Sequence, residues 1–222
     1  MASSVVCISR TDGALGDPIA HAVARQLDYR YVDEEIVQRA AEKANVDPET
    51  IMDAERRKSF VRRLLDGLPS TAVIVDPFRG ITGQPLGLEE VTLPAPRTTK
   101  ADARDVIRAV IGEVAHEGRV VIVAHAASMA LKGMAGVLRV LITASATVRA
   151  GRISHSGKLL EPSAATAAIR ESDRNRQDYL RRFYDVEREE PTHYDLVITT
   201  DVLTPEQAAT IVCAAARIAG GD

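Results

Sequence analysis

The chain has 222 residues, 45% of which are hydrophobic, and a formal net charge of −3 at pH 7. This length and composition are enough for a full hydrophobic core, and we expect one domain over residues 1–222. The small negative charge excludes a bulk attraction to nucleic acid or to anionic membranes, so any anion-binding site has to be local.

The N-terminal segment and the cysteines indicate the compartment. The first apolar stretch is short and has no basic residue before it, which argues against a signal peptide, and no apolar stretch is long enough to span a membrane. Cys7 and Cys213 lie far apart in apolar runs, which predicts two buried free thiols in a reducing compartment. The missing signal peptide and the free thiols together predict a cytoplasmic location. No histidine or cysteine has zinc-site spacing, so we expect no protein metal site.

The N-terminal region predicts a strand, a loop and a helix. Residues 5–9 form an apolar run, and a glycine-containing turn at residues 12–16 separates this run from residues 18–27, which have helical periodicity. Asp17 is a favourable N-cap, and Pro18 is a favourable first helical residue because proline lacks the N–H that would have no partner there.

The next segment changes in character along its length. Residues 29–32 predict a short strand, and residues 33–43 predict a helix whose first acidic side chains complement the helix dipole. A further helix is expected from residue 45 to about residue 65. Residues 67–100 contain five of the ten prolines, and we interpret them as an irregular insertion within the domain, in the manner of a mobile flap.

The second half of the chain alternates between helices and strands. Its apolar runs are nearly continuous, as in parallel strands that are covered on both faces. The predicted elements are a helix over 101–116, strands over 120–124 and 137–143, helices over 147–153 and 163–184, a strand over 196–200 and a helix over 205–218. The alternation predicts an α/β fold, a doubly wound parallel sheet of about five strands with helices on both faces.

Such a sheet places ligands at the carboxyl ends of its strands. The first strand leads into a loop whose small residues and following helix are typical of phosphate binding. Its candidate residues are Arg10, Gly13, Ala14, Leu15 and Gly16. The loop lacks the usual lysine, for which Arg10 is the nearest substitute, and the Asp17 carboxylate would compete with phosphate for the same N–H groups. An ordinary capped turn is the alternative interpretation.

Two further candidates follow the second and third strands. Asp33 is either a helix cap or a polar group that lines an acceptor pocket. His125 follows the third predicted strand, where an imidazole donates to a phosphate or takes part in acid–base catalysis. The alternative for His125 is a purely structural role.

Arginines form the fourth group of candidates. Arg149 and Arg152 share one face of a short helix by their spacing, and Arg170 and Arg176 lie with Asp173 on the long helix. Arginines that converge on a cleft neutralise the charge of a transferring phosphoryl group. The alternative is a solvated helix face with salt bridges.

Several stretches, in the same order along nearly the whole chain, resemble the cytidylate kinase-like family of P-loop nucleoside monophosphate kinases. These stretches are residues 6–10 with Gly13–Gly16, Tyr31–Asp33, Leu141–Ser145 with Val148–Arg152, Ile169–Arg176 and Tyr194–Thr200. The resemblance implies a P-loop NTPase-like fold. It also implies ATP-dependent phosphoryl transfer, with Mg²⁺, to a nucleoside monophosphate such as CMP.

The resemblance also assigns roles to residues. It implies that Arg149 and Arg152 lie on the lid helix and close over the transferring group, and that Asp173 and Arg176 contact the acceptor nucleotide. That branch of the family often lacks the phosphate-loop lysine. Residues 124–126 read Ala-His-Ala where family members commonly have Gly-Arg-Gly, so one phosphate-binding arginine is absent.

Three functions remain open from the sequence. The first is the nucleoside monophosphate kinase, and the second is a catalytically silent nucleotide-binding sensor or scaffold of the same fold. The third is a kinase for a sugar or a shikimate-like acid. We expect nucleotides as partners, with no nucleic acid and no membrane, and a homo-oligomer is left open. We also expect Arg176→Ala to abolish monophosphate binding and to leave the fold intact.

Overall fold

The computed structural model describes residues 3–49, 51, 100–123, 126–155 and 161–219. His125 and residues 67–99 of the predicted insertion lie outside this part of the chain. The elements are β1 (Val5–Arg10), α1 (Gly16–Leu27), β2 (Arg30–Val32), α2 (Glu35–Ala44), α5 (Lys100–Glu117), β3 (Val120–Ile122), α6 (Ala127–Ala130), β4 (Val137–Thr143), α7 (Ala146–His155), α8 (Pro162–Tyr184), the 3₁₀ helix η1 (Pro191–His193), β5 (Leu196–Thr199) and α9 (Pro205–Ala219).

The five strands form one parallel sheet in the order β2-β3-β1-β4-β5. Val5 of β1 lies opposite Val120 of β3 on one side and Val137 of β4 on the other. Because β1 is central, its carboxyl end lies in the middle of the edge where ligands bind in sheets of this kind. The predicted doubly wound α/β fold is confirmed.

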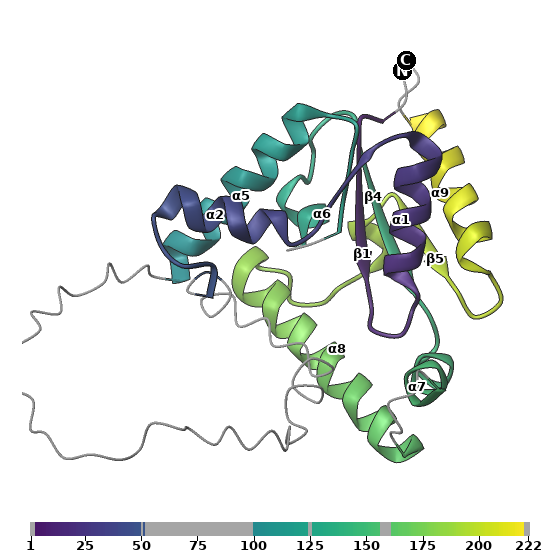
Figure 1. Cartoon of the computed structure of the whole chain (residues 1–222). Coiled ribbons are helices and arrows are strands. Elements are labelled where there is room, and N and C mark those ends of the chain that lie inside the picture. The colour runs from purple at the N-terminus through teal and green to yellow at the C-terminus, as the bar shows by residue number, and fades with distance from the viewer. Residues whose placement is uncertain (1–2, 50, 52–99, 124–125, 156–160, 220–222) are drawn as a thin grey trace, which may run out of the picture.

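Alternate residues of β1 face two separate parts of the core. Val6 and Ile8 pack into the cluster that α1 and α9 cover, whereas Val5 and Cys7 pack into the cluster that α2 and α5 cover. Figure 1 shows these helices on either side of the sheet. Burial on both faces explains why the strand reads as a continuous apolar run.

Both cysteines are buried and unbridged, as the sequence predicts. Burial raises the pKa of the Cys7 thiol to about 12, so this side chain packs as a small apolar group. In the part of the chain that the structure describes, no helix combines the length and the apolar character that crossing a membrane requires.

Helix α8 runs across the end of the sheet at which β1 terminates, and α7 lies beside its first half (Figure 1). The second half of α8 is anchored by Leu180 and Phe183, which pack with Met129 of α6 and Leu141 of β4. This packing holds the first half of α8 next to the loop that follows β1. The sequence did not predict α6, because four residues are too few to show a period.

The starts of two helices differ from the prediction. α1 begins at Gly16, two residues before Pro18, and its N-cap is Leu15 in a left-handed conformation with φ 61°. Asp17 lies in the first turn and makes no capping hydrogen bond. α2 has Glu34 at its N-cap, again without a side-chain cap, so Asp33 does not serve as one.

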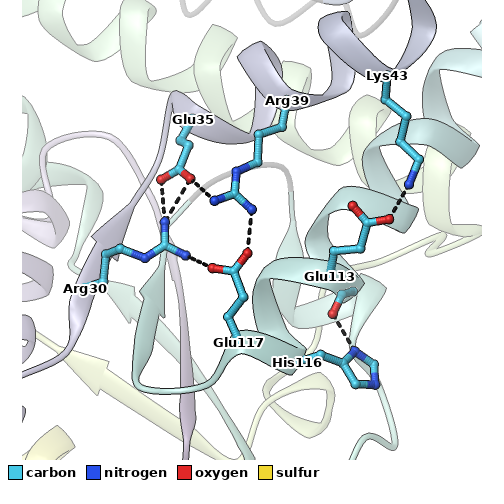
Figure 2. Close-up of polar contacts among 8 residues, drawn as sticks. Arg30, Glu35, Arg39, Lys43, Glu113, His116 and Glu117 are labelled. Carbon is cyan, nitrogen blue, oxygen red and sulfur yellow. Dashed lines mark hydrogen bonds and ion pairs between the residues drawn. The ribbon is translucent and has the colours of Figure 1, made fainter.

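Charged side chains on the surface join β2, α2 and α5. In Figure 2 the carboxylate of Glu117 from α5 lies between Arg30 of β2 and Arg39 of α2, and both arginines also contact Glu35 of α2. Lys43 and Glu113 form a further pair between the same two helices. This network adds electrostatic contacts to the apolar packing of α2 against α5.

Replacing Glu117 by Gln is expected to lower the free energy of unfolding by less than about 1 kcal/mol at pH 7, because exposed pairs are strongly screened. The hydrogen bond from Arg39 lowers the pKa of Glu117 below its ordinary value. A depressed folded-state pKa stabilises the protein above the unfolded pKa, and this contribution is lost as the pH falls through the folded pKa. The difference between variant and wild type should therefore vanish at acidic pH and in 1 M salt, as measured by thermal unfolding; a constant difference would contradict an electrostatic role.

Candidate functional site

The loop between β1 and α1 offers free backbone donors at the carboxyl edge of the sheet. Thr11 anchors the loop through its N–H to the carbonyl of Ile142 at 3.1 Å. The N–H groups of Gly13, Gly16 and Asp17 donate to no other residue that the structure describes. Free N–H groups at the start of a helix are the basis of anion binding in this type of loop.

Neighbouring residues lie so close to two positions of this loop that glycine is required there. Gly13 has a φ of 80°, and a Cβ at this position would lie 2.9 Å from the carbonyl oxygen of Arg149 in α7. A Cβ at Gly16 would lie 2.5 Å from the Cβ of Arg10. The loop is therefore enclosed between β1 and α7, and only glycine fits at either position.

Arg152 of α7 binds the loop and the end of β5 together. Its guanidinium donates to the carbonyl of Gly13 at 3.2 Å, to the hydroxyl of Thr200 at 2.9 Å and to the carbonyl of Thr200 at 2.5 Å. The hydroxyl of the fully buried Thr200 donates in turn to the carbonyl of Ala14 at 3.1 Å. No carboxylate among the described residues pairs with Arg152, so its positive charge stays uncompensated beside the loop.

Arg149, one turn earlier on α7, is held by an ion pair. Its guanidinium donates to both oxygens of Asp173 of α8, at 2.9 and 2.7 Å, and to the carbonyl of Asp12 at 3.4 Å. The Arg149 side chain is buried, whereas the Asp173 side chain is 41% exposed. The buried Nε of Arg149 has no hydrogen-bond partner among the described residues.

Arg176 of α8 is the centre of a second network. It donates to both oxygens of Glu189, at 2.7 and 2.5 Å, to the carbonyl of Arg10 at 3.2 Å and to the hydroxyl of Tyr194 at 3.2 Å. The hydroxyl of Tyr194 also donates to Glu189. The side chains of Arg176 and Glu189 are only 19% and 16% exposed, so the expectation that Arg176→Ala leaves the fold intact is at odds with this geometry.

The charges in this second network shift one another's titration. Burial disfavours the charged form of Arg176, but hydrogen bonds and attraction to Glu189 outweigh burial and raise the pKa of the guanidinium. Burial likewise acts against the charged carboxylate of Glu189, yet Arg176 holds its pKa below the ordinary value. Burial and the Glu189 carboxylate, partly offset by Arg176, raise the pKa of Tyr194 to about 12. Both members of the ion pair are therefore charged at neutral pH.

Arg10 connects the loop to the end of β2. Its Nε lies 2.6 Å from the carboxylate of Asp17 in the first turn of α1, and its guanidinium lies 3.9 Å from Asp33. Burial, together with the Asp33 and Asp17 charges, raises the pKa of the nearby Tyr31 to about 12. Asp17 thus pairs with Arg10 at the helix N-terminus, where the sequence predicted a cap.

The structure brings most of the predicted residues together. Arginines from α7 and α8 meet the loop, and Asp33 joins through Arg10. Arg170 is exposed on α8 and makes no hydrogen bond or ion pair within the described chain. Sequence reasoning missed Asp12, Ser172, Glu189, Tyr194 and Thr200. Thr200 could have been found by its place at the end of a strand, whereas Glu189 and Tyr194 lie in or beside an irregular segment that carries no such signal.

The described residues include no group of three or more His, Cys, Asp or Glu side chains that could hold a metal ion. Asp12 is the carboxylate between the end of β1 and the start of α1, and it accepts a hydrogen bond from the hydroxyl of Ser172 at 2.6 Å. A Mg²⁺ ion that enters with a nucleotide needs few protein ligands, because phosphate and water oxygens supply most of its octahedral shell.

Residues 5–202 match the sequence model of the cytidylate kinase-like family. The chain belongs to this family. Membership over this range makes it a P-loop kinase-like protein.

Solved structures also resemble this chain. It is similar to an uncharacterized protein from Eubacterium ventriosum ATCC 27560, with a TM-score of 0.64 and 13% identity over 96% of this chain and 98% of that chain. This likeness supports the fold. A shikimate kinase from Bacteroides thetaiotaomicron has a TM-score of 0.49 and 13% identity, over 95% of this chain and 97% of that one. A search among curated proteins finds no match.

Proposed function

We propose that this cytidylate kinase-like protein binds ATP through the loop of residues 10–17 and transfers a phosphoryl group to a nucleoside monophosphate such as CMP. The observation that supports this function is the meeting of three arginines at the loop. Arg149, Arg152 and Arg176 each donate to a backbone carbonyl of residues 10–13, although they lie far away in the sequence. Phosphoryl transfer depends mainly on positioning and on such charges.

Arg152 is the proposed catalytic residue. Its charge has no carboxylate partner among the described residues, and its contacts to Thr200 and Gly13 fix the guanidinium beside the loop. An arginine that is already oriented neutralises charge on the oxygens of the transferring phosphoryl group without reorganising first. Arg10 takes the place of the absent lysine on the other side of the loop.

Asp173 and Arg176 are the proposed acceptor-binding residues. Arg149, which the resemblance assigns to the transferring group, joins them because it pairs with Asp173. Asp33, 3.9 Å from the guanidinium of Arg10, is a further candidate. Arg149 and Arg176 make two-pronged contacts to carboxylates, and phosphate oxygens accept from a guanidinium in the same geometry. Asp173 is the more exposed carboxylate, so a monophosphate can replace it at Arg149 at little cost. His125 and Arg170 remain proposals for acceptor contacts that no described interaction supports.

ATP fits the chemistry of the loop. The free N–H groups of Gly13, Gly16 and Asp17 are donors for phosphate oxygens at the start of α1. Asp12, which lies between β1 and α1, would help to hold Mg²⁺, and the ion would supply positive charge against the donor phosphates. The arginines at the loop would orient the donor and the acceptor and would hold their negatively charged phosphates close together.

A catalytically silent nucleotide-binding protein is the second candidate. The observation in its favour is that acidic side chains already pair with two of the proposed phosphate-binding arginines. Asp17 lies at the start of α1 with Arg10 on its carboxylate, and Glu189 neutralises Arg176. A silent protein of this kind would bind the nucleotide weakly and would use the bound state as a signal.

Calorimetric titration with ATP and with CMP, each with Mg²⁺, followed by an ADP-release assay on the mixture, tests both candidates. Binding with turnover supports the kinase, and binding without turnover supports the silent protein. The absence of binding to either nucleotide would contradict both. Arg181→Ala is a matched control, because Arg181 is an exposed arginine of α8 whose ion pair is with Asp178 of the same helix.

Asp17→Asn is expected to tighten ATP binding about fivefold, the effect of one charge at a helix N-terminus. The change removes the carboxylate that competes for the N–H groups and releases Arg10. Calorimetry on the variant measures the gain. Glu206→Gln, which removes an acidic residue from the first turn of α9, is the control and should leave the affinity unchanged. A weaker ATP affinity in Asp17→Asn would show that this carboxylate assists binding.

We further propose that nucleotides are the partners of this protein and that it acts in the cytoplasm. The buried free thiols of Cys7 and Cys213 support a reducing compartment. Partners of another kind, and homo-oligomerisation, are tested together by sizing the purified protein with and without ATP.

A further inference from the structure

A cavity of about 220 Å³ lies apart from the loop, between α5, α6, the end of α8 and the segment that includes η1. Its lining residues are Arg108, Met129, Lys132, Tyr184, Val186 and His193. None of them belongs to the proposed ATP or acceptor site. The cavity is therefore a separate candidate site, independent of the proposed kinase function.

The polar side of this cavity is basic. Arg108, Lys132 and His193 line it, and no acidic residue does. Of the five N–H donors of Arg108, one is used by the carbonyl of Phe183 at 3.3 Å. Lys132 is exposed and forms no ion pair within the described ranges. Arg108 and Lys132 have no acidic partner among the described residues, and two such cations at one hollow attract an anion.

The other side of the cavity is apolar. Met129 belongs to the hydrophobic cluster that contains Leu180 and Phe183, and Tyr184 and Val186 pack against this cluster, so the cavity lies at the edge of packed core. The guanidinium of Arg108 lies over the Tyr184 ring, 4.9 Å from its centre, which orients a planar cation against a planar wall. A flat apolar ligand can stack on such a surface.

His193 is held in place at the rim. Its Nδ1 accepts the backbone N–H of Glu190 at 3.2 Å, within a capping arrangement at the start of η1. With Nδ1 as the acceptor, the proton of the neutral ring is on Nε2, which therefore remains a donor. The histidine thus offers a donor in both of its protonation states.

We propose that this cavity is a binding site for a small organic anion, a carboxylate or phosphate carried on a planar ring. The basic side chains bind the anionic group, and the apolar wall receives the ring. A volume of about 220 Å³ is below the range of drug-sized ligand pockets, which limits the ligand to about one ring and its anionic substituent.

Ligand-detected NMR with benzoate and phenyl phosphate tests the proposal, with benzamide as the neutral isostere of benzoate. Both anions are expected to bind at least fivefold more tightly than benzamide. Lys132→Ala should weaken both about fivefold, the effect of one exposed ion pair. Arg217→Ala, on the exposed side of α9, removes the same charge elsewhere and should change nothing. Equal binding of benzamide, or equal loss in both variants, would overturn the proposal.

Phenyl phosphate could also enter the proposed ATP site, so the same titrations are made on Arg152→Ala. Retained binding in this variant, and displacement of phenyl phosphate by benzoate, supports the cavity. Loss of binding in Arg152→Ala with no effect of Lys132→Ala would place the ligand at the loop and overturn the inference. A failure of the cavity is thus distinguished from a failure of the proposed function, which the ADP-release assay measures separately.

Discussion

Arg176→Ala should lower the free energy of unfolding by about 3 kcal/mol, in addition to any loss of nucleotide binding. The substitution leaves the Glu189 carboxylate without its cationic partner in a place where the side chain is only 16% exposed. It also removes the donors to the carbonyl of Arg10 and to the hydroxyl of Tyr194. The partial exposure of the pair places the effect at the lower end for a buried ion pair.

Urea unfolding of Arg176→Ala, Glu189→Ala and the double variant measures this effect as a cycle. The double variant is expected to be more stable than Arg176→Ala, because no charge is left unpaired. If Arg176→Ala is as stable as the wild type, then water or a rearranged side chain compensates the charge of Glu189. Nucleotide titrations on the stable double variant then isolate the binding role of Arg176 from its structural role.

Arg152→Ala is expected to lower kcat/KM for phosphoryl transfer about 10³-fold, the lower end for an arginine that stabilises the transferring group. Arg152→Ala should lower the free energy of unfolding less than Arg176→Ala does, because no described carboxylate loses a partner. The donors to Thr200 and Gly13 are lost, which costs about 1 kcal/mol of stability. The ADP-release assay and thermal unfolding measure the two effects side by side.

Two further variants separate charge from geometry at this position. Arg152→Lys keeps the charge but cannot reproduce the forked contact to the hydroxyl and carbonyl of Thr200, so it should recover little activity. Arg181→Ala removes an exposed arginine of α8 outside the proposed site and should retain full activity. If Arg152→Ala turns over ATP and CMP at the wild-type rate, Arg152 does not contact the transferring group.

The fold could be predicted because its strands are buried on both faces and therefore read as apolar runs. Val5 to Ile8 alternate between two cores, yet every residue in the run is apolar. The helix starts were harder to predict. The left-handed backbone of Leu15 lets α1 begin at Gly16, and a leucine gives no sign of this conformation, which normally favours glycine.

The candidate site could be predicted only where spacing or position carried a signal. Arg149 and Arg152 were found because helical spacing puts them on one face, and the glycines because a turn follows the first strand. Glu189 was missed because an irregular segment has no period, and its place beside Arg176 depends on tertiary packing. Asp17 was predicted to be a cap, but the attraction of Arg10 outweighs the local preference.

The central position of β1 between β3 and β4 delays assembly of the sheet. Within this sheet β1 is synthesised before its partners, and both of its neighbours lie within residues 120–143. Parallel pairing between segments so distant in the chain is slow to form. A nascent chain that ends before Val120 therefore carries an unpaired strand whose first four residues are apolar, and its protection from aggregation has to come from chaperones or from rapid completion of synthesis.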